Sequence, residues 1–496
     1  MGIAIGLDFG AVNSVVSYVD ATGGLKTFRQ GDSALIPSAI DFDGEKISGF
    51  KTKLNDGEDI FVAGKKLKPK FATKIFLNQL MAQVQEFLIK KFGAAEGLID
   101  RAVIAVPAKF SDAANRAIKN AAASAMNLSA NQIKLVYEPT AAAVAAQREN
   151  FSDASNFLIC DFGGGSFDAA LIQHSFGVFK QIDTDSDSNC GGENLTQLFA
   201  QYLWILANDE FGTDFPWDDS DFDEDFHGLS ELEYEQNRGE ILKAAENLKI
   251  SLSAENFVAV EFPFNVAENL SKNFSAEIPR ALFEELIRET VIHAAEIARR
   301  VANSGKVDKI ILAGGGSQIP LIRRVLRDNF LNLAVNYSAE VSTLISRGAA
   351  ILAQNIDSLE SRVAHKTAVE LGVASTSGLQ YNIFRAIIAA GVDIPCENSC
   401  DFKLLEDNQR RLEIACYERD ARNFPRARRI DDDGIRLVDV LQIDLPAGLK
   451  KSATRVKVFF RVESDTGLNF SAAVTSIDGD EIGGGNLQVH RASDLF

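Results

Sequence analysis

Two glycine-containing turns with the same residue order constrain the fold of this chain most strongly. One lies within Asn156 to Gln173, where an apolar run leads into Asp161-Phe162-Gly163-Gly164-Gly165-Ser166 and a second apolar run follows Asp168. The same pattern surrounds Asp8-Phe9-Gly10, 153 residues earlier in the chain. Strand, turn and strand in both places predict two hairpins of a duplicated fold, whose halves face each other across a cleft.

The second turn has the residue types that hold a phosphate group. Gly163 to Gly165 allow positive φ and a close backbone approach, so that successive N–H groups can point at an anion. Ser166 adds a hydroxyl donor. Asp161 and Asp168 repel phosphate but suit a hydrated Mg²⁺ that bridges protein and nucleotide. For this stretch alone, an ordinary glycine-rich β-turn is an equal alternative.

Length, charge and hydropathy narrow the class of protein. A chain of 496 residues is too long for one core and suggests about three domains. The formal net charge of −18 argues against a nucleic-acid partner, because no basic excess is present to replace phosphate counterions. No run approaches the roughly 18 apolar residues of a membrane span, and Asp8 interrupts the apolar N-terminus, so we expect no membrane association, no signal peptide and a cytoplasmic location.

The five cysteines are an odd number without a CxxC pair, as is typical of reduced thiols. A local bridge between Cys396 and Cys400 is the alternative.

Apolar spacing predicts several helices. One is expected over residues 65–92, and a second runs through Ala125 with Ser111 and Asp112 as its cap. Two more helices are expected over residues 233–253 and 280–303. Strands are expected over residues 101–107 and 134–137 in the first part of the chain.

Glu138 follows the second of these strands and precedes Pro139, at a point where a carboxylate can face a cleft. The alternative is a helix N-terminal acid that interacts with the helix dipole.

Two further patterns bear on a ligand. Glu246, Lys249 and Ser253 share one helix face, where a solvated salt bridge is the default interpretation. A strand over residues 307–312 runs into Ala313-Gly314-Gly315-Gly316-Ser317-Gln318-Ile319-Pro320, the third glycine loop that can point backbone amides at a ligand.

The composition changes from about Asp357 onward. Short alternating runs, separated by turn residues, replace helical periodicity and predict a separate β-sandwich. The runs cover residues 383–389, 412–417, 437–445, 455–463 and 468–477.

Taken together and in this order, the motifs resemble the DnaK-like heat-shock chaperones, the heat shock protein 70 family. Asp8-Phe9-Gly10 resembles the family's first phosphate loop, the segment from Asp161 to Asp168 its second, and Ala313 to Pro320 its adenosine loop. The resemblance implies an α/β actin-like, ribonuclease H-like duplicated ATPase domain followed by an all-β sandwich. The domains would be residues 1–356, with lobes of about 1–154 and 155–356, a linker over 357–370 and a sandwich over 371–496, without a helical lid.

The resemblance assigns roles to individual residues. Asp8 and Asp161 would hold Mg²⁺ through water, Glu138 and Asp168 would orient the attacking water, and Lys51, or alternatively Lys53, would reach the γ-phosphate. Contacts to ATP or ADP would further come from Gly10, Asn13, Gly163, Gly164, Gly165, Ser166, Glu246, Lys249, Ser253, Gly314, Gly315 and Gln318.

The chain departs from the family pattern in several places, including the absence of an acid expected near Ser342. Ala11 and Val12 replace two threonines, and Gln318 replaces an arginine that stacks on adenine. The linker at Ser361 to Lys366 has one large apolar residue, so coupling between nucleotide and peptide binding is not implied.

The resemblance implies an extended apolar polypeptide client and a J-type co-chaperone as partners. Candidate cleft residues in the sandwich are Phe384, Phe402, Leu405, Leu412 and Ile414, with sandwich core as the alternative for each. We therefore expect a chaperone-like ATPase. A regulatory or scaffold protein with little ATP turnover is the main alternative, and a sugar kinase on the same fold is a lesser one.

Overall fold

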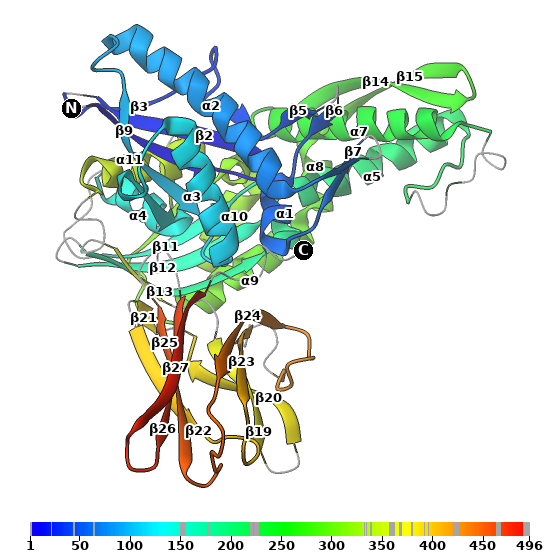
Figure 1. The fold of residues 1–496 in the computed structure, drawn as a ribbon. Helices are drawn as coiled ribbons and strands as arrows, with labels where there is room; N and C mark the ends of the chain where they lie inside the picture. The colour runs from blue at the N-terminus through cyan, green and yellow to red at the C-terminus, as the bar shows by residue number, and fades with distance from the viewer. Residues whose placement is uncertain are drawn as a thin grey trace. The chain divides into compact units, whose positions relative to one another are not determined.

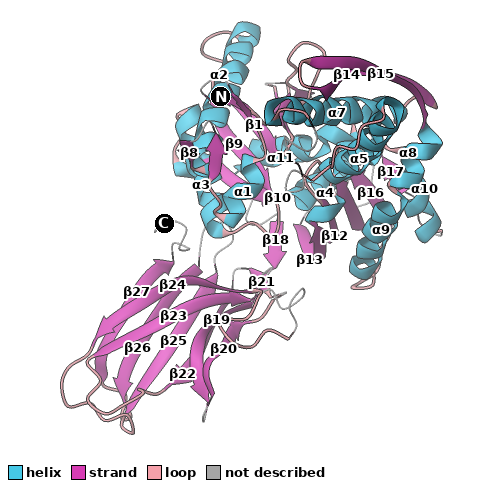
Figure 2. Cartoon of the chain, turned by 90° about the vertical axis from the view of Figure 1, so that its right-hand side faces the viewer, coloured by secondary structure: helices cyan, strands magenta, loops and turns pink. Residues whose placement is uncertain are grey.

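The computed structural model describes residues 2–20, 22–42, 45–62, 65–148, 155–175, 178–218, 222, 228–331, 333, 335–337, 340–356, 363–366, 370–377, 380–390, 392–394, 396–419, 426–462 and 468–489. These residues form a mixed α/β structure with several sheets (Figures 1 and 2). They divide into two compact units. The first comprises residues 1–156, 171–184 and 343–496, and the second comprises 157–170 and 185–342.

The first unit contains a sheet of order β10-β9-β1-β2-β3, with β4 paired to β2. β1 runs antiparallel to β2 and parallel to β9, which is itself parallel to β10. β1 is apolar from Ile3 to Leu7, where both of its faces are buried, and Asp8 is its one charged residue. The strands are β1 (Ile3–Phe9), β2 (Asn13–Val19), β3 (Leu25–Thr27), β4 (Ile36–Pro37), β9 (Ile99–Val106) and β10 (Ile133–Tyr137).

Alternate residues of β1 explain how helices pack on this sheet. Ile5 and Leu7 belong to the core that includes residues of α2 and α3. Gly6 points to the opposite face, where a Cβ would lie 2.1 Å from the Ala350 nitrogen of α11, so only glycine allows this helix so close. The helices of this part are α1 (Phe50–Asp56), α2 (Pro69–Phe92), α3 (Asp112–Met126), η1 (Ala130–Gln132), α4 (Glu138–Arg148), η5 (Val341–Thr343) and α11 (Leu344–Gln354).

Two of the predicted helix N-termini can be compared with the structure. The predicted Ser111 cap is confirmed, since its Oγ accepts a hydrogen bond from the Ala114 N–H at 3.2 Å. The prediction that a helix begins at Lys65 is wrong. Residues 65–67 pair with residues 60–62, and α2 begins only at Pro69, whose fixed φ suits a first helical position. The small hairpins are β5 (Ile40–Phe42) with β6 (Glu45–Ile47), and β7 (Ile60–Val62) with β8 (Lys65–Leu67).

The second unit is built around parallel strands. β11 pairs with β16, and β16 pairs with β17, both in parallel. The predicted single helix over 280–303 is instead two helices, α8 and α9, which are separated at Ile287, where φ −95° and ψ −1° depart from regular α-helix values. The helices of the second unit are η2 (Ser188–Cys190), α5 (Gly192–Phe211), α7 (Glu231–Leu252), α8 (Arg280–Leu286), α9 (Arg288–Ala302), η4 (Gly315–Gln318) and α10 (Pro320–Asn329). Its strands are β14 (Phe257–Ala267), β15 (Leu270–Pro279), β16 (Lys309–Ala313) and β17 (Val335–Tyr337), while β11 (Ser155–Phe162), β12 (Phe167–Ser175) and β13 (Val178–Asp187) pass between the units in sequence.

The C-terminal part of the first unit contains two four-stranded antiparallel sheets with one shared core. The five predicted strands are present, and β19, β22 and β27 were not predicted. The first sheet has the order β20-β19-β23-β24, from β19 (Glu370–Ser377), β20 (Gln380–Ile388), β23 (Arg411–Arg419) and β24 (Ile435–Asp444). The second has the order β22-β25-β26-β27, from β22 (Cys396–Phe402), β25 (Thr454–Val462), β26 (Leu468–Ser476) and β27 (Glu481–Val489).

The predicted linker lies only partly within the described residues. Residues 357–362 and 367–369 are outside them. Residues 363–366 form β18 (Val363–Lys366), which pairs in parallel with β13 and antiparallel with β21 (Asp393–Ile394).

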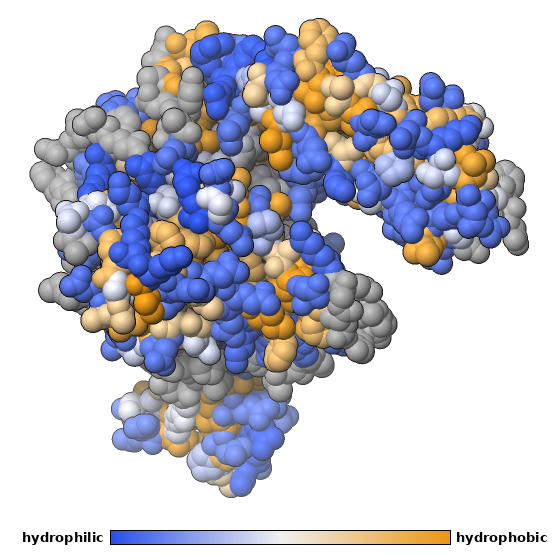
Figure 3. All heavy atoms as spheres, turned by 90° about the horizontal axis from the view of Figure 1, so that it is seen from above, coloured by the Kyte–Doolittle hydropathy of each residue, from blue (hydrophilic) through white to orange (hydrophobic). Residues whose placement is uncertain are grey.

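Polar side chains cover most of the face drawn in Figure 3, and apolar side chains form separate patches on it. Across the described part of the chain, no helix combines the length and the apolar character that a membrane span requires.

Candidate functional site

Three charged side chains meet at one edge of the first sheet. Asp8 is next to the last residue of β1, and Glu138 begins α4 directly after β10. Since both strands are parallel to β9, their carboxyl ends lie at the same edge. Lys51 of α1 extends to this edge, where its Nζ lies 2.8 Å from Oε1 of Glu138.

The charges of this cluster are largely withdrawn from solvent. Lys51 and Glu138 are buried, with 5% and 7% of their surface exposed, and the Lys51 ammonium also lies 5.8 Å from the ring centre of Phe9. The pKa of the half-buried Asp8 is raised to about 7, mainly by the loss of hydration and also by the charge of Glu138, while Lys51 opposes the shift. Two carboxylates therefore share one ammonium group, and a divalent cation near Asp8 would relieve their repulsion.

The structure distinguishes between the two lysines considered for the γ-phosphate. Lys51 is buried against Glu138, whereas Lys53 is half-buried in the last turn of α1. Lys51 is therefore the lysine that lies in the charged cluster.

The turn after Asp8 requires glycine at Gly10, where a Cβ would lie 2.0 Å from the Asn13 carbonyl oxygen. Sequence reasoning missed two hydroxyl groups beside this turn. Ser38 donates to the Gly10 carbonyl at 2.8 Å, and its Oγ lies 2.8 Å from that of Ser14. Both serines are fully buried, so these hydroxyls hold the turn and do not replace the two that are missing at Ala11 and Val12.

The second turn is a tight hairpin between β11 and β12 in the second unit. The Gly163 N–H donates to the Ser166 carbonyl at 3.0 Å. The Ser166 hydroxyl donates to Oδ2 of Asp168 at 2.6 Å, so the side chains of these two candidate residues are joined.

The start of α5 supports the hairpin from one side, which sequence reasoning had treated only as a turn before a helix. The Gly192 N–H donates to the Gly163 carbonyl at 2.9 Å, and the Glu193 N–H donates to the Gly164 carbonyl at 2.8 Å. Gly191 is so close that a Cβ would lie 2.5 Å from the Gly165 carbonyl carbon. The signal in the sequence was the Gly191-Gly192 pair itself, since a paired glycine marks a close backbone approach.

The candidate nucleotide-contact residues on α7 form a network with α5. Lys249 Nζ lies 2.6 Å from Oε2 of Glu246 and donates to the Gly192 carbonyl at 2.9 Å and to Thr196 Oγ1 at 2.8 Å. Ser253 lies one turn further along the helix and donates to the Lys249 carbonyl. Glu246 and Lys249 therefore belong to the same network that supports the second hairpin.

The third glycine loop lies beside Asp161. β11 and β16 are parallel with Asp161 opposite Ala313, so the next residue, Gly314, lies at the same strand ends. Gly314 has φ 77°, and a Cβ there would lie 2.3 Å from Oδ1 of Asp161. Gly315 begins η4, and Gln318 ends it with its Nε2 3.2 Å from Ser342 Oγ.

The candidate residues thus form two sets. Asp8, Lys51 and Glu138, with Gly10 and Asn13 in the adjacent turn, belong to the first unit. The second unit contains the other set, which consists of Asp161, Gly163, Gly164, Gly165, Ser166, Asp168, Glu246, Lys249, Ser253, Gly314, Gly315 and Gln318.

The candidate peptide-contact residues in the sandwich differ in exposure. Leu412 and Ile414 belong to the shared core, and Phe384 is buried. Phe402 is half-buried and lies 5.1 Å from the guanidinium of Arg385. Leu405 is 72% exposed and is therefore the candidate whose side chain is most open to a ligand.

Comparison with known proteins gives one consistent result. The family model described as Hsp70 protein matches residues 44–481. The DnaK chaperone proteins of Thermotoga petrophila and Thermotoga maritima are each 27% identical to this chain over 494 residues, which cover 94% of this chain and 78% of theirs. The DnaK chaperone protein of Ureaplasma parvum serovar 3 is 26% identical over 440 residues, covering 83% and 68%. The chain belongs to the Hsp70 family of chaperones.

Proposed function

We propose that this chain binds ATP or ADP with Mg²⁺ and hydrolyses ATP, as a chaperone whose sandwich contacts extended apolar polypeptide. The observation that carries the proposal is the cluster of Asp8, Lys51 and Glu138. A buried ion pair beside a carboxyl group with a pKa of about 7 serves no evident structural purpose, and strongly shifted groups of this kind gather at functional sites.

The two hairpins support an actin-like duplicated fold as part of this proposal. Each hairpin follows a strand with a parallel partner, and each has an aspartate near the end of that strand, at Asp8 and Asp161. Strands of this orientation collect their ligands at their carboxyl ends.

Different residues would serve different parts of the nucleotide. The tight turn at Gly163 to Ser166 would contact phosphate through backbone amides, and Gly314 would pass beside the adenosine. Asp8 and Asp161 would hold Mg²⁺ through its water molecules, since hard carboxylate oxygens suit this ion. The bound ion would neutralise charge on the phosphates.

Hydrolysis would then require a positioned water molecule. Glu138 and Asp168 are the candidate groups for orienting it, and each is held by a neighbour, Glu138 by Lys51 and Asp168 by Ser166. Phosphoryl transfer depends mainly on such positioning and on electrostatic stabilisation. To contact the γ-phosphate, the Lys51 ammonium would have to give up part of its interaction with Glu138.

The test is steady-state ATP turnover by the intact protein and by Glu138→Ala and Asp168→Ala. Removal of a water-positioning group is expected to lower turnover by about 10²- to 10⁴-fold. Glu413→Ala, which removes an exposed acid on β23, is the matched control and should turn over ATP like the unmodified protein. If the unmodified protein turns over ATP no faster than the two active-site variants, hydrolysis is excluded.

A second function is favoured by the turn after Asp8. Its nearby hydroxyls, on Ser14 and Ser38, are committed to holding the backbone, and Ala11 and Val12 supply none. A regulatory or scaffold protein that binds nucleotide with little turnover, and uses the sandwich for one dedicated partner, fits this loss. Tight nucleotide binding without turnover would favour this second function.

The polypeptide partner and a J-type co-chaperone are proposals of the same kind. Fluorescence anisotropy with a short apolar peptide tests the first, with ATP and with ADP. Equal peptide affinity in the two nucleotide states would exclude coupling between nucleotide and peptide.

A further inference from the structure

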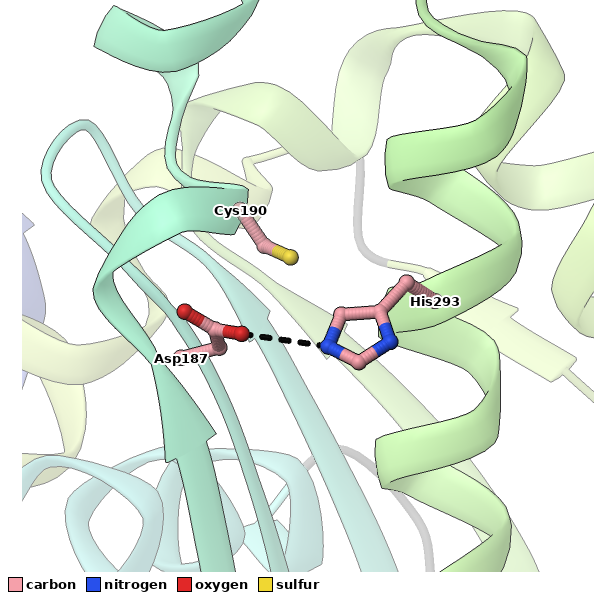
Figure 4. A group of neighbouring side chains, drawn as sticks. All are labelled: Asp187, Cys190 and His293. Atoms are coloured by element: carbon pink, nitrogen blue, oxygen red, sulfur yellow. Dashed lines mark hydrogen bonds and ion pairs between the residues drawn. The ribbon is translucent and has the colours of Figure 1, made fainter.

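A cluster of three metal-ligating side chains lies at the end of β13, outside the residues assigned to the nucleotide. Asp187, Cys190 and His293 each offer a ligand atom, and these atoms all lie within 4.8 Å of one another (Figure 4). Asp187 ends β13, Cys190 ends η2, and His293 lies on α9. All three belong to the second unit.

Local backbone geometry brings Asp187 and Cys190 together. Oδ1 of Asp187 accepts a hydrogen bond from the Asn189 N–H at 2.7 Å and so caps η2. Asp187 directly precedes η2 and Cys190 is its last residue, so a single short 3₁₀ turn brings their ligand atoms within 4.8 Å of each other. The second carboxylate oxygen, Oδ2, remains directed at His293 Nε2, 3.1 Å away.

Contacts with α9 complete the cluster. The Cys190 Sγ donates to the Thr290 carbonyl at 3.9 Å, and His293 lies three residues further along the same helix face. On the other side of the imidazole, Oε2 of Glu296 lies 3.8 Å from Nδ1. A carboxylate at this second nitrogen is the usual means of orienting a metal-bound histidine.

The chemistry of the three groups selects a class of metal. Thiolate, imidazole and carboxylate are the zinc ligands of proteins, and three protein ligands leave a fourth position for water. Ligand atoms around a tetrahedral zinc are roughly 3.3 to 3.8 Å apart, given its usual bond lengths. The distance of 3.1 Å between Asp187 Oδ2 and His293 Nε2 is just below this range. No separation among the three ligand atoms exceeds 4.8 Å, about 1 Å above the range, and small side-chain rotations can supply the difference.

The burial of the three residues suits an ion that enters from solvent. Cys190 is buried, Asp187 is half-buried, and the His293 side chain is 48% exposed.

We propose that Asp187, Cys190 and His293 form a binding site for a divalent transition metal ion of the zinc class, which ties η2 to α9. Cys190 is followed directly by Gly191 and Gly192, whose backbone supports the Gly163 to Ser166 hairpin. A bound ion therefore fixes the segment on which the hairpin rests. Metal binding itself needs no nucleotide, so it is tested independently of the proposed ATPase.

The test is a Co²⁺ titration of the full chain after treatment with a chelator. The expected result is saturable binding of one equivalent, with tetrahedral cobalt absorption and a thiolate-to-cobalt charge-transfer band, both abolished by one equivalent of Zn²⁺. Cys190→Ser should remove the charge-transfer band. His293→Ala should weaken binding by more than about 100-fold, since even the loss of an indirect ligand contact costs 10- to 100-fold.

Two controls keep the result decisive. Cys400→Ser removes a half-buried thiol on β22 and should leave the spectrum unchanged. His293 is half-exposed, so His293→Ala should fold even if Cys190→Ser does not, and circular dichroism checks both.

Saturating Zn²⁺ should also slow hydrogen exchange in peptides that cover residues 187–193. The proposal is overturned if the unmodified protein shows no one-equivalent cobalt spectrum, if the charge-transfer band persists in a folded Cys190→Ser variant, or if exchange in this segment is unchanged.

Discussion

Asp8 should make the protein less stable as the pH rises, opposite to a paired carboxylate whose pKa is lowered by folding, and its replacement by asparagine should remove this effect. The pKa of Asp8 rises from 3.8 to about 7 in the folded protein. The folded state therefore holds a proton that the unfolded state has lost, and stability falls as the pH increases between these two values. An asparagine side chain cannot ionise, so the Asp8→Asn variant should lack this loss.

The magnitude follows from the shift. About three pKa units at 1.36 kcal/mol each correspond to a loss of roughly 4 kcal/mol in the free energy of unfolding at pH 8. At pH 5 the loss is only about 1.6 kcal/mol. Because the Asp8 side chain keeps some contact with solvent, these values are upper bounds. We expect Asp8→Asn to gain up to about 3 kcal/mol of stability relative to the unmodified protein between pH 5 and pH 8.

Scanning calorimetry of both proteins without nucleotide, at pH 5 and at pH 8, measures this difference as a change in Tm. The change in Tm should appear in the unfolding transition of the first unit, which contains Asp8. Asp20→Asn is the control, because Asp20 is held by Thr22 and Gly24 and its pKa is lowered by these hydrogen bonds. Its effect should be the same at both pH values. An equal effect of Asp8→Asn at pH 5 and pH 8 would refute the electrostatic account of this site.

Five further substitutions test other parts of the structure. Lys51→Met should destabilise the protein by about 3–5 kcal/mol in chemical unfolding, because it leaves Glu138 buried and uncompensated, and Glu138→Gln should cost less because Lys51 keeps Asp8 as a partner. Gly191→Ala should cost about 1–3 kcal/mol and weaken binding of a fluorescent ADP, because its Cβ meets backbone atoms; unchanged binding would contradict the close packing. Leu405→Ala should leave stability within about 0.5 kcal/mol while lowering peptide affinity, whereas Leu412→Ala should cost about 2–5 kcal/mol; the reverse order would be inconsistent with their exposures.

The sequence predicted those parts of the fold that depend on local chemistry. The strand that ends near Asp161 and the Ser111 cap follow from apolar runs and from the preference of serine for helix starts. Both signals lie within a few residues of the feature that they predict.

Features that depend on contacts between distant segments were not predictable. Lys51 and Glu138 are 87 residues apart, and nothing near Lys51 distinguishes it from Lys53. β22 and β27 were missed because CENSCDF is largely polar and EIGGGNLQV contains a glycine run that suggests a turn. Both strands exist because they extend the sheet formed by β25 and β26, which supplies the missing backbone partners.

The metal-ligating cluster was missed for a related reason. Asp187 and Cys190 have the spacing of a ligand pair, but His293 follows about 100 residues later and carries no local signal. Only the packing of η2 against α9 brings the three residues together.

Calorimetric titration of the full chain with ADP, with and without Mg²⁺, tests the central claim most directly. The account predicts one saturable site whose affinity falls when Mg²⁺ is removed, and falls again in the Asp8→Asn variant. It also predicts that binding with Mg²⁺ releases a proton near pH 7, since the ion favours the ionised form of Asp8. The absence of saturable heat with ADP and Mg²⁺, in a protein shown to be folded, would contradict the claim that these residues form a nucleotide site.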